Sequence, residues 1–361
     1  MKKIKVFILL SFLAGPIIQL LGQDPNYSQF LNAPMYYNPA YTGLYTGLHA
    51  RLSFRDQWPA LPYDFKSYHF SADIGDRNLP GSGGLGLMLN TDNDGLGFIR
   101  NFNLGISLAV RIPFSAMTIG QLGIKASWLQ KSVRWDDFVF SDALSEKYGN
   151  VYKTGFIPPA NNVLNLPDFG VGGIVQFANE PGSLSGTLGL AVDHLFEPDQ
   201  SFLQTAKAPL PRKWVAHADM IVAIGGSNGF NVLEEGALKI NPGVIYQNQG
   251  NLNAFQVGMN LTKFGVYVGL WMKGAFGSYS NGSMVFLGGY RYVFADNMSV
   301  KFTYNYDMQL TGALQGTGGA HEISLVLDFG NISIFGGTEG SSRLRPHGRG
   351  GYDSRLECSE F

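Results

Sequence analysis

Residues 102–112, FNLGISLAVRI, decide the fold class of this chain. Every second residue is large and apolar, and the residues between them are small or polar. Period-two alternation places the two sets on opposite faces of a β-strand. The run is long for a soluble strand, which usually has about 5–6 residues. In a membrane barrel, such a strand turns its apolar set to lipid and its polar set to the lumen.

The alternation recurs between residues 46 and 329, for example at 48–54 (LHARLSF) and 298–308 (MSVKFTYNYDM). We therefore predict an all-β fold, a transmembrane outer-membrane β-barrel of about 14 antiparallel strands, an even number as in bacterial barrels. Closure removes free sheet edges, which lipid cannot hydrogen-bond. The predicted strands span 46–56, 64–74, 83–91, 97–112, 117–131, 168–178, 183–194, 212–225, 236–247, 251–262, 264–274, 282–294, 297–308 and 320–329.

Composition agrees with a barrel. The 361 residues carry a formal net charge of -1, and 15% are charged, against roughly 25% in soluble domains. Once the N-terminus is set aside, no apolar run reaches the roughly 20 residues of a transmembrane helix. These features indicate the outer membrane of a Gram-negative bacterium, with membrane lipid as the surroundings. The balanced charge gives no reason to expect nucleic acid as a partner.

The two ends of the chain differ from the barrel region. Three lysines precede the apolar run 6–21, which predicts a signal peptide at residues 1–22. The alternative, an uncleaved anchor, is disfavoured because the run is short for a span. The alternation stops after Phe329, and we expect residues 330–361 to form a disordered tail. The single cysteine, Cys358, excludes an intrachain disulfide and a thiolate metal cluster.

Residues 23–45, which begin QDPNYSQFLNAPMYYNPAYTG, have no regular period. Prolines interrupt any ladder, yet the stretch is too apolar for a free linker. We predict a plug-like segment that docks inside or across the periplasmic end of the barrel. Packing loosely on the wall before the first strand is the alternative. The residues that we expect to make the contacts are Tyr37, Asn38, Pro39, Tyr41 and Gly43.

The polar phase of the strands carries charges of both signs. We expect Arg51, Arg111, Lys301, Asp307 and Glu322 to be the principal lumenal polar residues. Opposite charges in a confined lumen can lock a plug, or can set selectivity in an open pore. The same phase predicts that the following residues point inward: Arg55, Lys66, Asp73, Lys125, Asp219, Lys239 and Arg291.

Loop lengths are asymmetric. Connections 57–63, 132–167, 195–211 and 309–319 are long and lie outside the cell if both termini are periplasmic, while most of the alternate connections are short. Connection 132–167 is the longest. It is either a lid or partner surface, or a loop that only shields the mouth of the barrel.

No pattern supports catalysis. The glycines at 81–86 match G-x-G-x-x-G, but strand-like alternation follows where a nucleotide loop needs a helix. Residues 92–94, Asp-Asn-Asp, are interpreted as a hairpin turn rather than a calcium loop. His217 and Asp219 share one strand face and are interpreted as a lumenal polar pair. We therefore predict a protein that is not an enzyme, with no catalytic, cofactor-binding or metal residues and no cofactor.

Several ordered motifs resemble one family. They are QDPNYSQFLNAPMYYNPAYTG at 23–43, RDQW at 55–58 with Tyr68, Ser71 and Asp73 beyond it, GGLGLMLNTDNDG at 83–95, PRKWVAHADM at 211–220 and YNYDMQLTGALQGTGGAHEISLVLDF at 304–329. Together they resemble the PorP/SprF family of outer-membrane proteins, associated with type IX secretion and gliding motility. The tail after Phe329 departs from the family, whose barrels usually end at a terminal aromatic strand.

The resemblance implies a non-enzymatic barrel that supports secretion, or the surface attachment of adhesins, through protein contacts. It implies as partners a periplasmic lipoprotein or other type IX secretion component, and the C-terminal domain of a secreted adhesin. The competing hypothesis is an outer-membrane transport channel for small or hydrophobic substrates, with residues 23–45 as a movable hatch. A third hypothesis, a lipase-like barrel, lacks any supporting spacing of serine, histidine and carboxylate.

Overall fold

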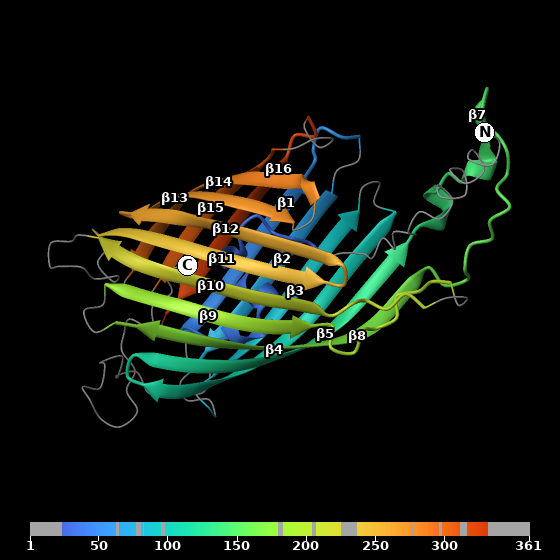
Figure 1. Ribbon diagram of the computed structural model, residues 1–361. Helices are drawn as coiled ribbons and strands as arrows, with labels where there is room; N and C mark the ends of the chain where they lie inside the picture. Colours follow the sequence, from blue (N-terminus) through green and yellow to red (C-terminus); the bar gives the residue numbers. More distant parts are fainter. Residues whose placement is uncertain are drawn as a thin grey trace, which may run out of the picture.

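A computed structural model describes residues 24–62, 65–76, 81, 83–94, 98–179, 183–203, 207–224, 237–275, 278–295, 298–310 and 316–330. The predicted signal peptide and almost all of the predicted tail lie outside these residues. Within them, 14 strands form one closed barrel (Figure 1). The strands are β1 (Gly47–Gln57), β2 (Phe65–Gly75), β3 (Gly84–Asp94), β4 (Ile99–Ser115), β5 (Thr118–Val133), β8 (Val163–Ala178), β9 (Leu184–Asp193), β10 (Lys213–Ile224), β11 (Leu238–Gln249), β12 (Leu252–Lys263), β13 (Val266–Ala275), β14 (Ser278–Ala295), β15 (Met298–Gln309) and β16 (Ala320–Phe329).

Each barrel strand pairs antiparallel with the next barrel strand along the chain, and β1 closes the barrel by pairing with β16 from Leu48 opposite Phe329 to Gln57 opposite Ala320. The predicted fold class and strand number are therefore confirmed. The predicted ends differ most at β8, which begins at Val163, and at β14, which begins at Ser278. β8 starts early because β5 continues as far as Val133, and Ser132 lies opposite Val163.

The predicted turn at residues 92–94 is wrong, because β3 continues to Asp94. Asp92 and Asn93 pair with Asn101 and Arg100 of β4. The ladder between the two strands overrides the local turn preference of the asparagine and aspartates.

The outer wall is apolar, and the inner wall is largely polar. Leu190 is 69% exposed and Ile106 is 60% exposed, whereas Arg111 and Asp219 are buried inside. A continuous exposed apolar wall is unfavourable in water and suits a lipid environment. Lys66 is a correction, since it shares the outward face of β2 with exposed Tyr68. Asp73, also predicted to point inward, is buried, so the phase of β2 that places Asp73 inside places Lys66 outside.

The barrel has two rims that differ. At the first rim β1 begins and β16 ends, and the second rim lies where β1 ends at Gln57. Residues 134–162, here called the excursion, leave the second rim between β5 and β8 and extend beyond the barrel (Figure 1). The excursion contains η4 (Trp135–Asp137), η5 (Ser141–Ala143), β6 (Leu144–Ser145) and β7 (Gly149–Asn150).

Residues 24–45, here called the N-terminal segment, contain three single-turn helices, η1 (Phe30–Asn32), α2 (Pro34–Tyr37) and η2 (Pro39–Tyr41). No helix in the described part of the chain is long and apolar enough to cross a membrane. The segment lies within the barrel, as the deep blue ribbon of Figure 1 shows, and its contacts with the wall define the site below.

Candidate functional site

Prolines and side-chain caps shape the N-terminal segment. Pro34 opens α2 and Pro39 opens η2, the positions where the missing N–H of proline costs nothing. The Asn38 side chain accepts a hydrogen bond from the N–H of Ala40 at 2.9 Å and so caps η2. These single turns form no strand, in keeping with the prediction that the prolines interrupt a regular ladder.

A small apolar core lies inside the barrel. Phe30 and Tyr37 are each 1% exposed and belong to one cluster with inward side chains of the wall. The Phe30 ring meets Trp271 edge to face at 5.7 Å, and the Trp271 indole N–H donates to Asn260 Oδ1 at 2.8 Å. The other wall residues of the cluster are Met88, Ala191, Val215, Ile245 and Val285. The inner wall is therefore apolar where the segment rests.

Asn38 is fully buried and joins the segment to three strands. Its Nδ2 donates to the carbonyls of Gly173 in β8 at 3.2 Å and Leu190 in β9 at 3.3 Å. It also lies 3.1 Å from Nε2 of His217 in β10. The Tyr41 ring stacks on the His217 ring with 5.2 Å between the ring centres. The Tyr41 hydroxyl donates to Asp219 Oδ1 at 3.4 Å. The polar pair inferred at 217 and 219 thus contacts the segment.

Four inward glycines, here called the glycine socket, make room for these contacts: Gly86, Gly123, Gly172 and Gly189. A Cβ at Gly172 would lie 2.1 Å from Asn38 Oδ1, and one at Gly123 would lie 2.4 Å from the Pro39 backbone. A Cβ at Gly86 would lie 2.4 Å from Met35 Cε. Sequence reasoning missed this socket, although glycines at the inward phase of several strands were its visible signal.

The segment reaches β1 through a fixed turn at the first rim. Gly43 has φ +59°, a conformation that favours glycine. Its N–H donates to Asp73 Oδ2 at 2.9 Å, and Arg51 donates to Asp73 Oδ1 at 2.7 Å. Arg111 donates to the Leu44 carbonyl. Both lumenal arginines therefore hold this end of the segment.

Asp307 and Glu322 form a buried charge cluster with Arg55 and Lys273. Arg55 lies 2.9 Å from Asp307 and 3.6 Å from Glu322, and Lys273 lies 3.2 Å from Asp307. The Ser28 N–H donates to Glu322 Oε2 at 2.6 Å. Two cations and two carboxylates balance, so the cluster attaches the segment to β1, β13, β15 and β16 without a net charge.

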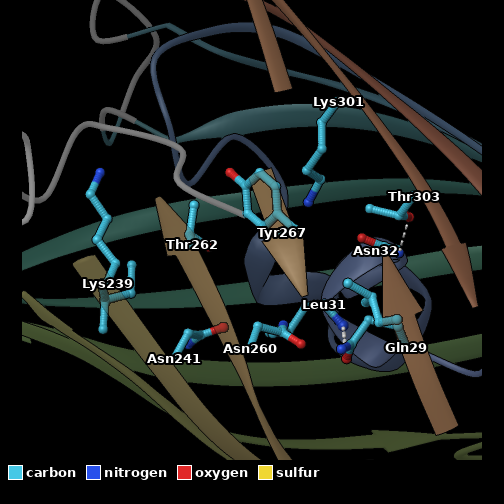
Figure 2. Close-up of a pocket in the computed structure, with 12 residues that line it drawn as sticks. Gln29, Leu31, Asn32, Lys239, Asn241, Asn260, Thr262, Tyr267, Lys301 and Thr303 are labelled. Carbon is cyan, nitrogen blue, oxygen red and sulfur yellow. Dashed lines mark hydrogen bonds between the residues drawn. The ribbon is translucent and has the colours of Figure 1, made fainter. Parts of the chain in front are cut away.

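Lys301 borders a narrow space of about 20 Å³ under η1 (Figure 2). Its ammonium lies 5.6 Å from the centre of the Tyr267 ring. Beside it, the Asn32 side chain of the segment donates to Thr303 Oγ1 at 2.9 Å. Figure 2 shows Asn32 and Thr303 joined in this way, so β15 also contacts the segment.

The first described residue, Asp24, lies at the second rim. It makes ion pairs with His194 at 3.0 Å and Lys213 at 3.2 Å. Burial alone would raise the pKa of Asp24, but the charges of Lys213 and His194 hold it well below its usual range. Burial would lower the pKa of His194, but Asp24 and Asp168 raise it to about 10.

The segment therefore runs from the second rim to the first, rather than lying only at the end where β1 begins. Among the described residues, no group of three or more histidine, cysteine, aspartate or glutamate side chains is arranged to hold a metal ion.

A closed antiparallel barrel with an apolar outer wall and a charged lining defines the class of outer-membrane β-barrel proteins. Within that class, the chain belongs to the family of the type IX secretion system membrane protein PorP/SprF, whose model matches residues 20–327. No curated protein matches the chain.

Solved structures are also similar. CdiB from Acinetobacter baumannii has 8% identity and a TM-score of 0.41, over 79% of this chain and 60% of CdiB. The CymD monoaromatic hydrocarbon channel has 12% identity and a TM-score of 0.44, over 87% and 96% of the two chains. A FadL homologue of Pseudomonas aeruginosa has 10% identity and a TM-score of 0.43, over 82% and 94%.

Proposed function

We propose that this chain is a non-enzymatic barrel of the type IX secretion and gliding machinery whose lumen is closed by its own N-terminal segment. It supports the secretion or surface attachment of adhesins through protein contacts. The observation that carries this proposal is the set of bonds from the segment to strands around the whole barrel, from Asp73 in β2 to Glu322 in β16.

The number and variety of these bonds favour a permanent plug over a hatch. Leaving the lumen would expose the buried Phe30 and Tyr37 rings and would break the contacts of Asn38. Burial of each large apolar side chain is worth roughly 1.5–3 kcal/mol. A small substrate passing through the barrel offers little to offset such a loss.

With its lumen closed and its wall in lipid, the barrel offers its rims to protein partners. The first rim is the proposed contact for a periplasmic lipoprotein or another secretion component. The excursion at the second rim is the proposed contact for the C-terminal domain of an adhesin. Its Tyr148 and Tyr152 are well exposed, and aromatic side chains are enriched at protein interfaces.

The test removes this surface and leaves the barrel intact. Residues 141–156 are replaced by a short glycine-serine linker, and surface adhesin is quantified by whole-cell labelling. Type IX components that co-purify in mild detergent are measured in parallel. We expect surface adhesin to fall while the barrel remains heat-modifiable. Wild-type surface adhesin and an unchanged set of partners in the variant would contradict this assignment of the second rim.

The alternative is an outer-membrane transport channel for small or hydrophobic substrates, which requires the segment to leave the lumen. Single-channel recording separates the two functions, because a plugged scaffold is electrically silent.

A further inference from the structure

A recess of about 490 Å³ lies between the N-terminal segment and the second rim. Its floor includes Asn26 and Tyr36 of the segment, and its walls include Trp58, Asn90 and Asn103 from the region of β1, β3 and β4. Ligand pockets typically have volumes of roughly 300–1,000 Å³. The recess is therefore large enough for a small organic ligand.

Charged side chains that line the recess are engaged within the protein. Arg55 pairs with Asp307 at 2.9 Å, Asp24 pairs with His194 at 3.0 Å, and Lys131 donates to Gln200 at 3.1 Å. Much of the remaining lining is neutral amide, including Gln57, Asn93 and Gln130. Because the charges already have partners, the lining is better suited to a neutral polar ligand than to an ion.

Some of the neutral polar groups have no partner in the protein. These are Trp58 Nε1 and Asn90 Nδ2, which donate, and Asn103 Oδ1, which accepts, and all three atoms are buried. Asn90 is only 3% exposed. Buried polar groups are normally hydrogen-bonded, and unpaired ones require an explanation. A ligand whose groups both donate and accept would satisfy all three.

Trp58, the last residue of the RDQW motif, is held in an unusual conformation. Its φ is +62°, which bulky residues rarely adopt. Its backbone N–H donates to the Gly319 carbonyl at 2.7 Å, and its ring meets Phe65 edge to face at 5.1 Å. Strained residues of this kind concentrate at functional sites. The backbone and the indole of Trp58 are thus each held by one contact at the wall of the recess.

We propose that this recess binds a neutral oligosaccharide, with Trp58 as the aromatic platform and the amides as partners for its hydroxyl groups. Sugar hydroxyls both donate and accept hydrogen bonds, and the C–H face of a pyranose packs on an indole. A polypeptide fits less well, because the closed barrel leaves no strand edge for a peptide to extend. The inference goes beyond the proposed function, since sugar binding does not require a secretion partner.

The test titrates purified full-length protein, in a detergent without a sugar headgroup, with maltotriose, cellotriose and triacetylchitotriose by calorimetry. We expect at least one trisaccharide to bind. Trp58→Ala should weaken that binding by about tenfold through the lost ring contact. Asn103→Ala, which leaves the backbone of β1 untouched, should weaken it by about threefold. Trp214→Ala, on the exposed outer wall, should bind like the wild type.

Two further arms identify the source and class of the ligand. Binding of lipopolysaccharide from the native membrane that a free neutral trisaccharide displaces would support the proposal and assign the sugar to a neighbouring lipid. Failure of all these sugars at millimolar concentration would overturn the proposal. Equal binding by Trp58→Ala, Asn103→Ala and wild type would also overturn it, as would binding of a neutral Asn-Gly-Ser peptide but of no sugar. Heat-dependent gel mobility confirms that each variant is folded.

Discussion

The N-terminal segment and the excursion are similar in composition and local structure, but the segment is buried and the excursion is exposed. Both are aromatic, both contain single-turn helices, and neither adds a strand to the barrel. The segment is buried almost throughout, with Tyr37 at 1% exposure. The excursion is largely exposed, with Ile157 at 87%. Aromatic composition alone therefore does not decide whether an irregular stretch becomes part of the core.

The surroundings of the two stretches account for the difference. The wall offers the segment a glycine socket, apolar inward side chains and a balanced charge cluster. The outer part of the excursion contacts itself, as Phe140 does with Phe156 at 4.5 Å and Asp142 with the Gly155 N–H at 2.6 Å, and near the barrel Phe138 contacts Phe98 at 5.0 Å. A buried irregular stretch thus needs a matching cavity, which only the assembled strands can supply.

The largest expected effect comes from comparing the buried charge cluster that attaches the segment to the wall with an exposed ion pair in the excursion. Asp307→Ala leaves Arg55 and Lys273 buried with Glu322 as their main counter-charge, and should cost roughly 3–5 kcal/mol of unfolding free energy. Asp137→Ala in the excursion removes an exposed pair with Arg134 and should cost about 0–1 kcal/mol. Urea unfolding in lipid vesicles, read by gel mobility, compares them. Equal losses would contradict the contrast between buried and exposed regions.

The second-largest expected loss of stability comes from a pair of glycine substitutions. A side chain at Gly172 collides with Asn38, which the strands around it hold in place, so Gly172→Leu should cost roughly 1–3 kcal/mol. It should also make residues of the segment accessible to protease. Gly155→Ala in the excursion meets only an ordinary contact at 3.7 Å and should be neutral. If the segment of Gly172→Leu remains protected from protease, the glycine socket does not hold the segment in the lumen.

The smallest effect is a pH dependence at the second rim. The lowered pKa of Asp24 adds stability above about pH 4 that is lost as pH falls. The raised pKa of His194 adds stability that is complete below about pH 6.5 and lost as pH rises through about 10. Asp24 and Asp168 face His194, and Lys213 also faces Asp24. The ion pair between Asp24 and His194 should therefore be most stable between about pH 4 and 6.5.

A nitroxide at Asn26→Cys, with Cys358→Ser, should report this change as increasing mobility toward pH 10. His194→Asn is the matched control, because asparagine tolerates the positive φ of +57° and does not titrate. The control should show no mobility change in that range. The same alkaline transition in both proteins would remove His194 as its cause.

The barrel was predictable because alternation is a local property. All 14 strands of the barrel, among the described residues, correspond to predicted ones, since each displays its period without reference to its neighbours. The ends of β3 and β8 were not predictable, because the length of a strand depends on how far its partners continue.

The site was less accessible to prediction than the barrel. Prolines and apolar residues marked the segment as one that must pack, but its path to the second rim depends on partners far away in sequence. The bond from Ser28 to Glu322, for example, joins residues on the first described stretch and the last strand. Inward Val215, Ile245 and Trp271 occupy positions that alternation alone assigns to polar residues. Apolar side chains at the lumenal phase are thus the signal of a filled lumen.

Conductance in planar bilayers tests most directly whether the N-terminal segment closes the barrel. Wild-type protein should be silent, and a variant lacking residues 24–42, which keeps Gly43 at the entry to β1, should conduct steadily. A matched deletion of residues 141–156 from the excursion should stay silent. Steady conductance by the wild type, equal to that of the variant without the segment, would contradict the account.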